Sequence, residues 1–149
     1  MGIETDIKQK KFGTEHEKAI INILYTASWI DTTNIKRFKP FGLTAQQFNV
    51  LRILRGSHPK KLMLSDIAGR MIDKNSNATR LVEKLRVNGL VTREQCPENR
   101  RQVDIAITQK GLDLLADIDT HTDKWLKNFK NLTVQEFKTL NDLLDKLRS

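Results

Sequence analysis

The sequence predicts a mainly α-helical chain with one small β-hairpin, and three observations indicate this fold class. Apolar residues recur at three- and four-residue steps along most of the 149 residues, which is the period of an amphipathic helix. From Gln102 to Ile107 large apolar residues alternate with polar or small ones, as in a half-buried strand. Thr44 and Thr133 each precede Gln or Glu by three positions, which is the capping-box pattern that opens a helix.

A long first helix is predicted from about Glu15 to Arg37. Its apolar stripe includes Ile20 and Leu24, and further apolar residues widen the stripe beyond one face. A helix of this kind needs more than one neighbour, so it is a candidate dimer element. The segment 39–42 should end it, because Pro40 disfavours helix in the preceding residue.

A helix-turn-helix pattern follows. The Thr44 box opens a helix to about Arg55, and a short helix with a poorly capped start at Met63 comes next. Its markers are Leu64, Ile67, Ala68, Met71 and Ile72. After a polar turn at 73–77, apolar residues at i, i+3, i+4 and i+7 predict a further helix: Ala78, Leu81, Val82 and Leu85. Gly89 should end it in a left-handed conformation.

The hairpin is predicted from residues 90–96 and 101–107, with the turn at 97–100 and with Val103, Ile105 and Ile107 on the buried side. Thr108 should cap a helix that continues to about Asn128, and Thr133 should open the last helix. The order of helices, hairpin and basic tip predicts a winged helix-turn-helix. We expect one unit over residues 1–149, with a winged helix region at 41–108 and dimerisation helices at 1–40 and 109–149.

The positive charge is concentrated in this predicted winged region. The chain has a net charge of +8, but residues 34–110 contain 16 Lys and Arg against 6 Asp and Glu, and the remainder has a net charge of −2. A local cationic surplus is typical of a protein that binds double-stranded DNA. No apolar run reaches the roughly 20 residues that span a bilayer, so no membrane is expected as a partner. The polar N-terminal segment and the single cysteine, Cys96, predict a cytoplasmic protein.

The residues expected to bind DNA fall into two groups. Short polar and guanidinium side chains at the start of the fourth helix can contact base edges in the major groove: Asn75, Ser76, Asn77, Thr79 and Arg80. Lys84 on the same helix is expected to contact phosphate. At the wing, Asn99, Arg100 and Arg101 can enter a minor groove, where a narrow A·T tract concentrates negative potential. Other basic residues are expected to contact phosphates: Lys60, Lys61, Arg70, Lys74 and Arg86.

In order and spacing, these motifs resemble the MarR family of bacterial winged-helix regulators. The matching residues are Leu43-Thr44 with Gln47-Phe48, Thr79-Arg80-Leu81-Val82, Gly89-Leu90-Val91 with Arg93, Arg100-Arg101, and Ile107-Thr108 with Gly111. The resemblance implies a homodimer that binds a pseudo-palindromic operator and releases the DNA when a small-molecule effector binds. We expect the regulator to be a repressor. The expected interface residues are Ile20, Leu24, Trp125, Phe137, Leu140 and Leu144. The family's wing usually has Asp where this chain has Asn99, which weakens the expected contact with the guanidinium of Arg101.

The same residues are compatible with other interpretations. The wing and helix could form a protein-protein interaction module that has no sequence-specific contact with DNA. Trp29, Trp125 and Phe129 are interpreted as packing residues, and the walls of a ligand cavity are the alternative. The acidic run around Asp117 is interpreted as solvated surface, with no metal or cofactor. The sequence contains no nucleophile elbow, zinc-ligand spacing or phosphate-binding glycine loop, so no enzyme is expected.

Overall fold

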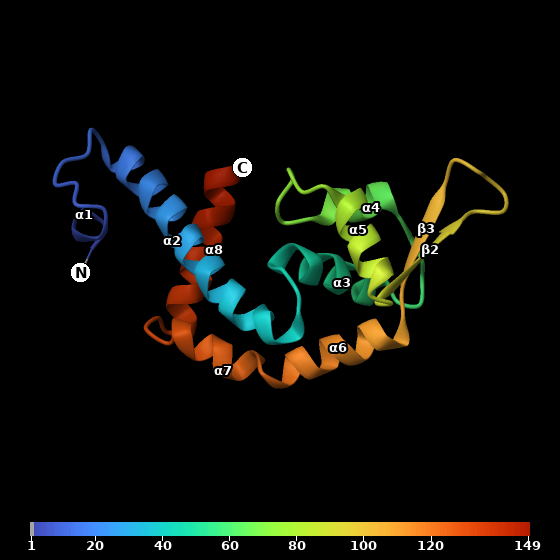
Figure 1. Ribbon diagram of the computed structural model, residues 1–149. Helices are drawn as coiled ribbons and strands as arrows, with labels where there is room; N and C mark the ends of the chain where they lie inside the picture. Colours follow the sequence, from blue (N-terminus) through green and yellow to red (C-terminus); the bar gives the residue numbers. More distant parts are fainter. Residues whose placement is uncertain (1) are drawn as a thin grey trace. The chain divides into compact units, whose positions relative to one another are not determined.

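The computed structural model describes residues 2–149. They form two compact units, one that ends at Leu112 and one that runs from Asp113 to Ser149. Figure 1 shows helices in both units and a small sheet in the first. In chain order the elements are α1 (Ile3–Asp6), α2 (Glu15–Phe38), the 3-10 helix η1 (Lys39–Phe41), α3 (Ala45–Ser57), β1 (Leu62–Met63), α4 (Leu64–Arg70), α5 (Ala78–Val87), β2 (Val91–Gln95), β3 (Val103–Ile107), α6 (Gln109–Thr120), α7 (Thr122–Leu126), the 3-10 helix η2 (Lys127–Phe129) and α8 (Val134–Arg148). The predicted fold class is confirmed.

The first long helix, α2, begins and ends close to the predicted residues. The Thr14 hydroxyl accepts a hydrogen bond from the Glu17 amide at 3.1 Å and caps the start. The helix ends in η1, after which Gly42 adopts a left-handed φ of 68°. Glycine reaches this conformation without the steric cost that a side chain would add. The predicted break at 39–42 is therefore confirmed.

The core of the first unit lies between α3, α4, α5 and the sheet. The Thr44 capping box is present, since Thr44 and Gln47 exchange two side-chain hydrogen bonds of 3.0 and 3.1 Å. Large apolar side chains with almost no exposed surface fill this core: Leu51, Leu54, Ile67, Leu85 and Ile105. Phe38 at the end of α2 stacks on Phe48 of α3, with ring centroids 4.4 Å apart. The periodicity therefore identified the buried sides correctly.

Helix α4 differs from the prediction at both ends. Its start is capped after all, because the Asp66 carboxylate accepts a hydrogen bond of 3.1 Å from the Met63 amide. It ends at Arg70, one residue before Met71 and two before Ile72, so the prediction that both belong to the helix is wrong. The Ile72 amide donates instead to the side chain of Asn49 in α3, at 2.9 Å. The Ile72 side chain is 77% exposed.

The sheet contains the predicted hairpin and one strand that the sequence analysis missed. Strands β2 and β3 are antiparallel, with Val91 opposite Ile107 and Gln95 opposite Val103. Ile105 and Ile107 are buried as predicted, whereas Val103 is only half-buried. The third strand, β1, pairs with the other edge of β3. Its two residues are too few to show a strand period.

The base of the hairpin is joined tightly to the first turn of α6. The Thr108 hydroxyl donates to the Gly89 carbonyl at 2.7 Å and accepts from the Gly111 amide at 3.1 Å, which confirms the predicted cap. A Cβ atom added at Gly111 would lie 2.5 Å from the Leu90 carbonyl oxygen and 2.7 Å from a side-chain carbon of Ile107. Only glycine fits at this position without movement of the backbone.

We expect Gly111→Ala to destabilise the first unit. The added methyl group would force the hairpin and α6 apart, and overpacking of this kind costs about 1–3 kcal/mol. Gly56→Ala in α3 is the matched control, because nothing lies within 4 Å of its added Cβ. The control should be neutral or stabilising by up to about 1 kcal/mol. Thermal unfolding followed by circular dichroism checks both, and equal melting temperatures for the two variants would contradict the steric argument.

The second unit departs from the prediction of one continuous helix to about residue 128. The helix is interrupted at His121, so α6 and α7 are separate segments. Two neighbouring hydroxyls compete for the helical carbonyls: Thr120 donates to Asp117 at 2.6 Å, and Thr122 donates to Ile118 at 3.4 Å. Hydroxyls that bond back to carbonyls three or four residues earlier bend helices.

The last helix, α8, begins as predicted. Thr133 and Glu136 form a reciprocal capping box, with hydrogen bonds of 3.0 and 3.1 Å. The backbone amide and the hydroxyl of Thr133 also lower the pKa of Glu136 below its usual value, because they stabilise the carboxylate. Among residues 2–149, no helix combines the length and the apolarity that a membrane span requires. The same residues contain no group of three or more His, Cys, Asp or Glu placed to hold a metal ion.

Candidate nucleic-acid interface

Helix α5 presents a polar side to solvent and an apolar side to the core. Ala78, Leu81, Val82 and Leu85 are buried, as the i, i+3, i+4, i+7 spacing predicts. They pack the helix onto α3, α4 and β2. Because the apolar side fixes the rotation of the helix, the opposite side exposes Thr79, Arg80 and Lys84.

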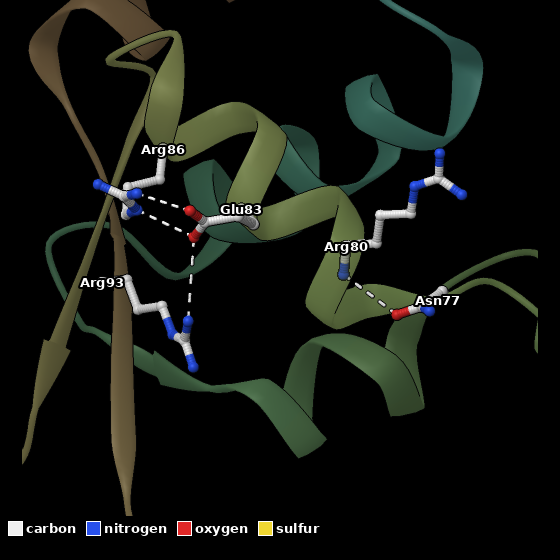
Figure 2. A network of polar contacts seen from close by, with 5 residues as sticks. All are labelled: Asn77, Arg80, Glu83, Arg86 and Arg93. Atoms are coloured by element: carbon white, nitrogen blue, oxygen red, sulfur yellow. Dashed lines mark hydrogen bonds and ion pairs between the residues drawn. The ribbon is translucent and has the colours of Figure 1, made fainter.

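The start of α5 is capped by Asn77. Its side-chain oxygen accepts a hydrogen bond of 3.1 Å from the Arg80 amide, as Figure 2 shows. Asn75 and Asn77 are both exposed, whereas the Ser76 hydroxyl oxygen is buried and makes no hydrogen bond. Five of the six residues predicted at the recognition helix therefore reach solvent, and Ser76 does not offer its hydroxyl there.

The turn that precedes α5 is held by α3. Asn49 is only 6% exposed, and its side-chain oxygen accepts a hydrogen bond from the backbone amide of Ile72. The side-chain amide of Gln46 donates a hydrogen bond of 3.2 Å to the Asp73 carboxylate. Asp73 in turn accepts the Asn75 amide at 2.9 Å. This role of Asn49 was not predicted from the sequence. The available signal was an amide side chain directly beside the apolar residues of α3.

The wing tip presents Arg100 and Arg101 to solvent, where the sequence analysis expected them. Asn99 orders the tip through the backbone: its side-chain oxygen accepts the Arg101 amide at 3.1 Å, and its carbonyl accepts the Gln102 amide at 2.9 Å. The Gln95 side chain also donates to the Arg100 carbonyl. Asn99 therefore shapes the turn that carries the two guanidinium groups. The resemblance implied a contact between Asn99 and the guanidinium of Arg101, whereas the Asn99 side chain contacts the backbone amide of Arg101 instead.

Several basic residues expected to contact phosphates have partners within the chain. Lys61 forms an ion pair of 3.1 Å with Glu94 of β2. The Arg70 guanidinium donates to the Ser57 hydroxyl at 3.1 Å, and Lys74 donates to the Gly69 carbonyl. These contacts tie the C-terminal end of α4 to α3 and the segment before β1 to strand β2 of the wing.

A second polar cluster joins the middle of α5 to the hairpin, and the sequence analysis missed it. Figure 2 shows the carboxylate of Glu83 between the guanidinium groups of Arg86 and Arg93. Arg86 donates to both Glu83 oxygens, at 2.6 and 2.9 Å, and an Arg93 nitrogen lies 3.9 Å from one of them. The hydrogen bonds from Arg86, and then the charges of Arg86 and Arg93, lower the pKa of Glu83 below its usual value. The carboxylate is therefore ionised at neutral pH.

The residues expected at a dimer interface lie on α2, α7 and α8. Ile20 and Leu24 of α2 are 45% and 64% exposed, although both are large and apolar. Phe137 and Leu140 of α8 are 36% and 40% exposed. Leu144 and Trp125 are half-buried, and the Trp125 ring packs edge-on against Phe129 with centroids 5.0 Å apart.

Comparison with known proteins identifies the family. The MarR family model matches residues 43–103, which include the helix-turn-helix and most of the hairpin. The chain is 32% identical to the helix-turn-helix transcriptional regulator YkoM of Bacillus subtilis over 114 residues, which are 76% of this chain and 73% of YkoM.

Solved structures agree with that assignment. A MarR transcription factor from Planctomyces limnophilus is 32% identical, with a TM-score of 0.70 over 91% of this chain and 98% of that one. A MarR-like regulator from Bacillus cereus, 23% identical, has the same fold with a TM-score of 0.81 over 91% and 97% of the two chains. Members of this family are transcription regulators and not enzymes, which confirms the expectation from the sequence. The chain belongs to the MarR family of DNA-binding transcriptional regulators.

Proposed function

We propose that this regulator is a homodimeric repressor that binds a pseudo-palindromic operator with two copies of α5 and two wings. The observation that carries the proposal is the placement of Arg80 and the Arg100–Arg101 tip on one winged unit, whose segment 34–110 has a net charge of +10. The start of an exposed recognition helix can enter a major groove, and an arginine-tipped wing can follow the backbone into the next minor groove.

Each polar group has a distinct place in this proposal. Arg80 and Thr79 contact base edges near the start of α5, and Asn75 and Asn77 lie close enough to the same end to assist. Lys84, one turn further along, contacts phosphate. Arg100 and Arg101 enter the minor groove, in a turn that Asn99 orders. Ser76 has no contact in this scheme, because its hydroxyl is buried.

Exposed apolar side chains support the dimer. Large apolar residues of α2 and α8 remain at the surface of the single chain, among them Leu24, Leu143 and Leu147 at 55% or more. A protein gains free energy by covering such groups, at about 25 cal/mol per Å² of apolar surface. A second copy of the chain is the simplest cover, and it also gives the twofold symmetry that a palindromic operator requires.

Relatives support repression and control by a small molecule. IacR of Pseudomonas putida, 29% identical over 116 residues, is a transcriptional repressor. BpsR of Bordetella bronchiseptica shares the fold, and its DNA binding is regulated by 6-hydroxynicotinic acid. The organohalide-sensing regulator RdhR, also of this fold, has been solved with 2,4-dichlorophenol bound. We infer that this chain responds to a small aromatic effector and needs no cofactor for DNA binding.

The test is DNA binding measured against salt with duplexes selected from the genome. A dimer that contacts about 6–10 phosphates should lose roughly 10³- to 10⁵-fold in affinity between about 50 and 200 mM salt, and it should prefer one palindrome. Fluorescence anisotropy with the selected and scrambled duplexes measures both quantities. Weak binding without sequence preference would overturn the proposal and favour the protein-protein interaction module.

A further inference from the structure

Glu83 is the acidic residue of the recognition helix, in the most basic segment of the chain. It lies four residues after Thr79 and therefore on the same side of α5, one turn further from the helix start. Its side chain is 44% exposed. A carboxylate there repels the phosphates of any duplex that α5 approaches, so its presence on this helix requires an explanation.

The contacts of Glu83 supply that explanation. Arg86 is held side-on, with one hydrogen bond to each carboxylate oxygen, and Arg93 approaches from β2. In this geometry the guanidinium of Arg86 uses two of its donors within the chain. Figure 2 shows that the Arg80 side chain extends away from this cluster. The recognition helix therefore has one arginine outside the cluster and one inside it.

A phosphate and the Glu83 carboxylate compete for the same guanidinium donors. An arginine that binds a phosphate gives affinity that depends on salt and not on sequence, because every duplex offers the same phosphates. An arginine that is held by a carboxylate of the same chain contributes less of this sequence-independent affinity, because its donors are already in use. The cluster thus reduces the sequence-independent part of DNA binding and leaves base contacts from the start of α5 unaffected.

We propose that Glu83 is a specificity determinant that limits sequence-independent DNA binding by holding Arg86 and Arg93 away from phosphates. The proposal rests on the operator-binding function proposed above. A purely structural role, in which Glu83 only fastens α5 to β2, is the competing explanation, and it predicts weaker binding to every duplex when Glu83 is changed.

The test is Glu83→Gln, which keeps the shape of the side chain and removes the charge. Each released arginine that binds a phosphate should make the negative slope of log affinity against log salt concentration steeper by about 0.9, and it should raise the affinity roughly tenfold near 0.1 M salt. We expect tighter binding to a scrambled duplex, a smaller change on the selected operator, and hence a lower ratio between the two. Fluorescence anisotropy over a series of salt concentrations measures all three.

Two further variants separate the explanations. Arg86→Gln should weaken binding of the parent protein only modestly, because Glu83 already holds Arg86 and Arg93 still faces the carboxylate. Combined with Glu83→Gln it should remove much of the gain, since Arg86 can then no longer be released to a phosphate. Asp145→Asn is the matched charge control, because Asp145 pairs with Arg148 at the same i, i+3 spacing in α8, outside the winged unit. It should leave the slope unchanged.

The outcomes distinguish this inference from the function on which it rests. If the parent protein binds its operator with a steep salt dependence but Glu83→Gln has the parent's slope and affinity for scrambled DNA, the proposal for Glu83 is wrong. Weaker binding of Glu83→Gln to both duplexes, with a lower melting temperature, would assign Glu83 the structural role instead. If the parent protein shows no sequence preference in DNA binding, the proposed operator-binding function is wrong, and the proposal for Glu83 that rests on it is wrong as well.

Discussion

Replacing Leu140 with aspartate (Leu140→Asp) is expected to separate the proposed dimer into monomers. Leu140 lies on the apolar stripe of α8 and is 40% exposed in the single chain, so the change should leave the fold of the monomer intact. Dimerisation can bury at most the 40% of the Leu140 side chain that the single chain leaves exposed, which contributes about 0.6–1.2 kcal/mol per copy, and the loss of water from the new carboxylate costs at least about as much again. Because the dimer contains the position twice, the total loss is about 2–5 kcal/mol, which weakens dimerisation roughly 30- to 4,000-fold.

Sedimentation velocity over a range of protein concentrations checks this expectation. Gln135→Asp is the matched control, because it adds the same charge to an exposed residue of α8 that lies five residues before Leu140, on the opposite side of the helix. The control should sediment as the parent does, and both variants should keep the parent's helical circular dichroism. A Leu140→Asp variant that still sediments as a dimer would show that the stripe on α8 is not the interface.

Arg80→Ala is expected to produce the largest loss of operator recognition. A guanidinium that bonds a guanine in two places contributes about 1–3 kcal/mol of discrimination at each half-site. The side chain is exposed, and the helix cap uses only the Arg80 backbone amide, so the fold should not change. We expect weaker binding to the operator together with a relaxed preference at one position of each half-site.

The measurement is binding to a set of operators, each with one base pair replaced. Lys84→Ala is the informative comparison, since a lysine that contacts phosphate should weaken binding evenly across the set and reduce the salt slope by about 1. If Arg80→Ala weakens all operators by one common factor, Arg80 contacts phosphate and the base contact assigned to it is wrong.

The elements that the sequence predicted well are those whose signals are local. The capping boxes at Thr44 and Thr133 and the left-handed Gly89 involve residues within a single turn, and all are present. Strand β1 was missed because its stability comes from pairing with β3, about forty residues away in the chain. The break at His121 depends on hydroxyl groups whose bonds to the backbone an apolar periodicity does not record.

In the candidate site, too, the residues predicted correctly are those whose signals are local in the sequence. The exposure of Thr79 and Arg80 follows from the apolar side of α5, and the exposure of Arg101 follows from the hairpin turn. The i, i+3 spacing of Glu83 and Arg86 on α5 was an available signal for their pair, whereas the contact of Glu83 with Arg93 joins two elements and neither element alone indicates it. The burial of the Ser76 hydroxyl depends on how the turn before α5 folds, which short polar residues leave open. The DNA contacts assigned to these residues stay predictions until the experiments above are made.

The joint at Thr108 has a mechanical consequence. One hydroxyl connects the carbonyl of Gly89 to the amide of Gly111, and Lys110 adds a hydrogen bond of 2.8 Å to the Asn88 carbonyl. These hydrogen bonds therefore tie the first turn of α6, the base of the wing and the end of α5 together. We expect the wing and α5 to turn with the first turn of α6, so that in the proposed dimer a change in the direction of α6 at this joint would change the spacing of half-sites that the protein can span.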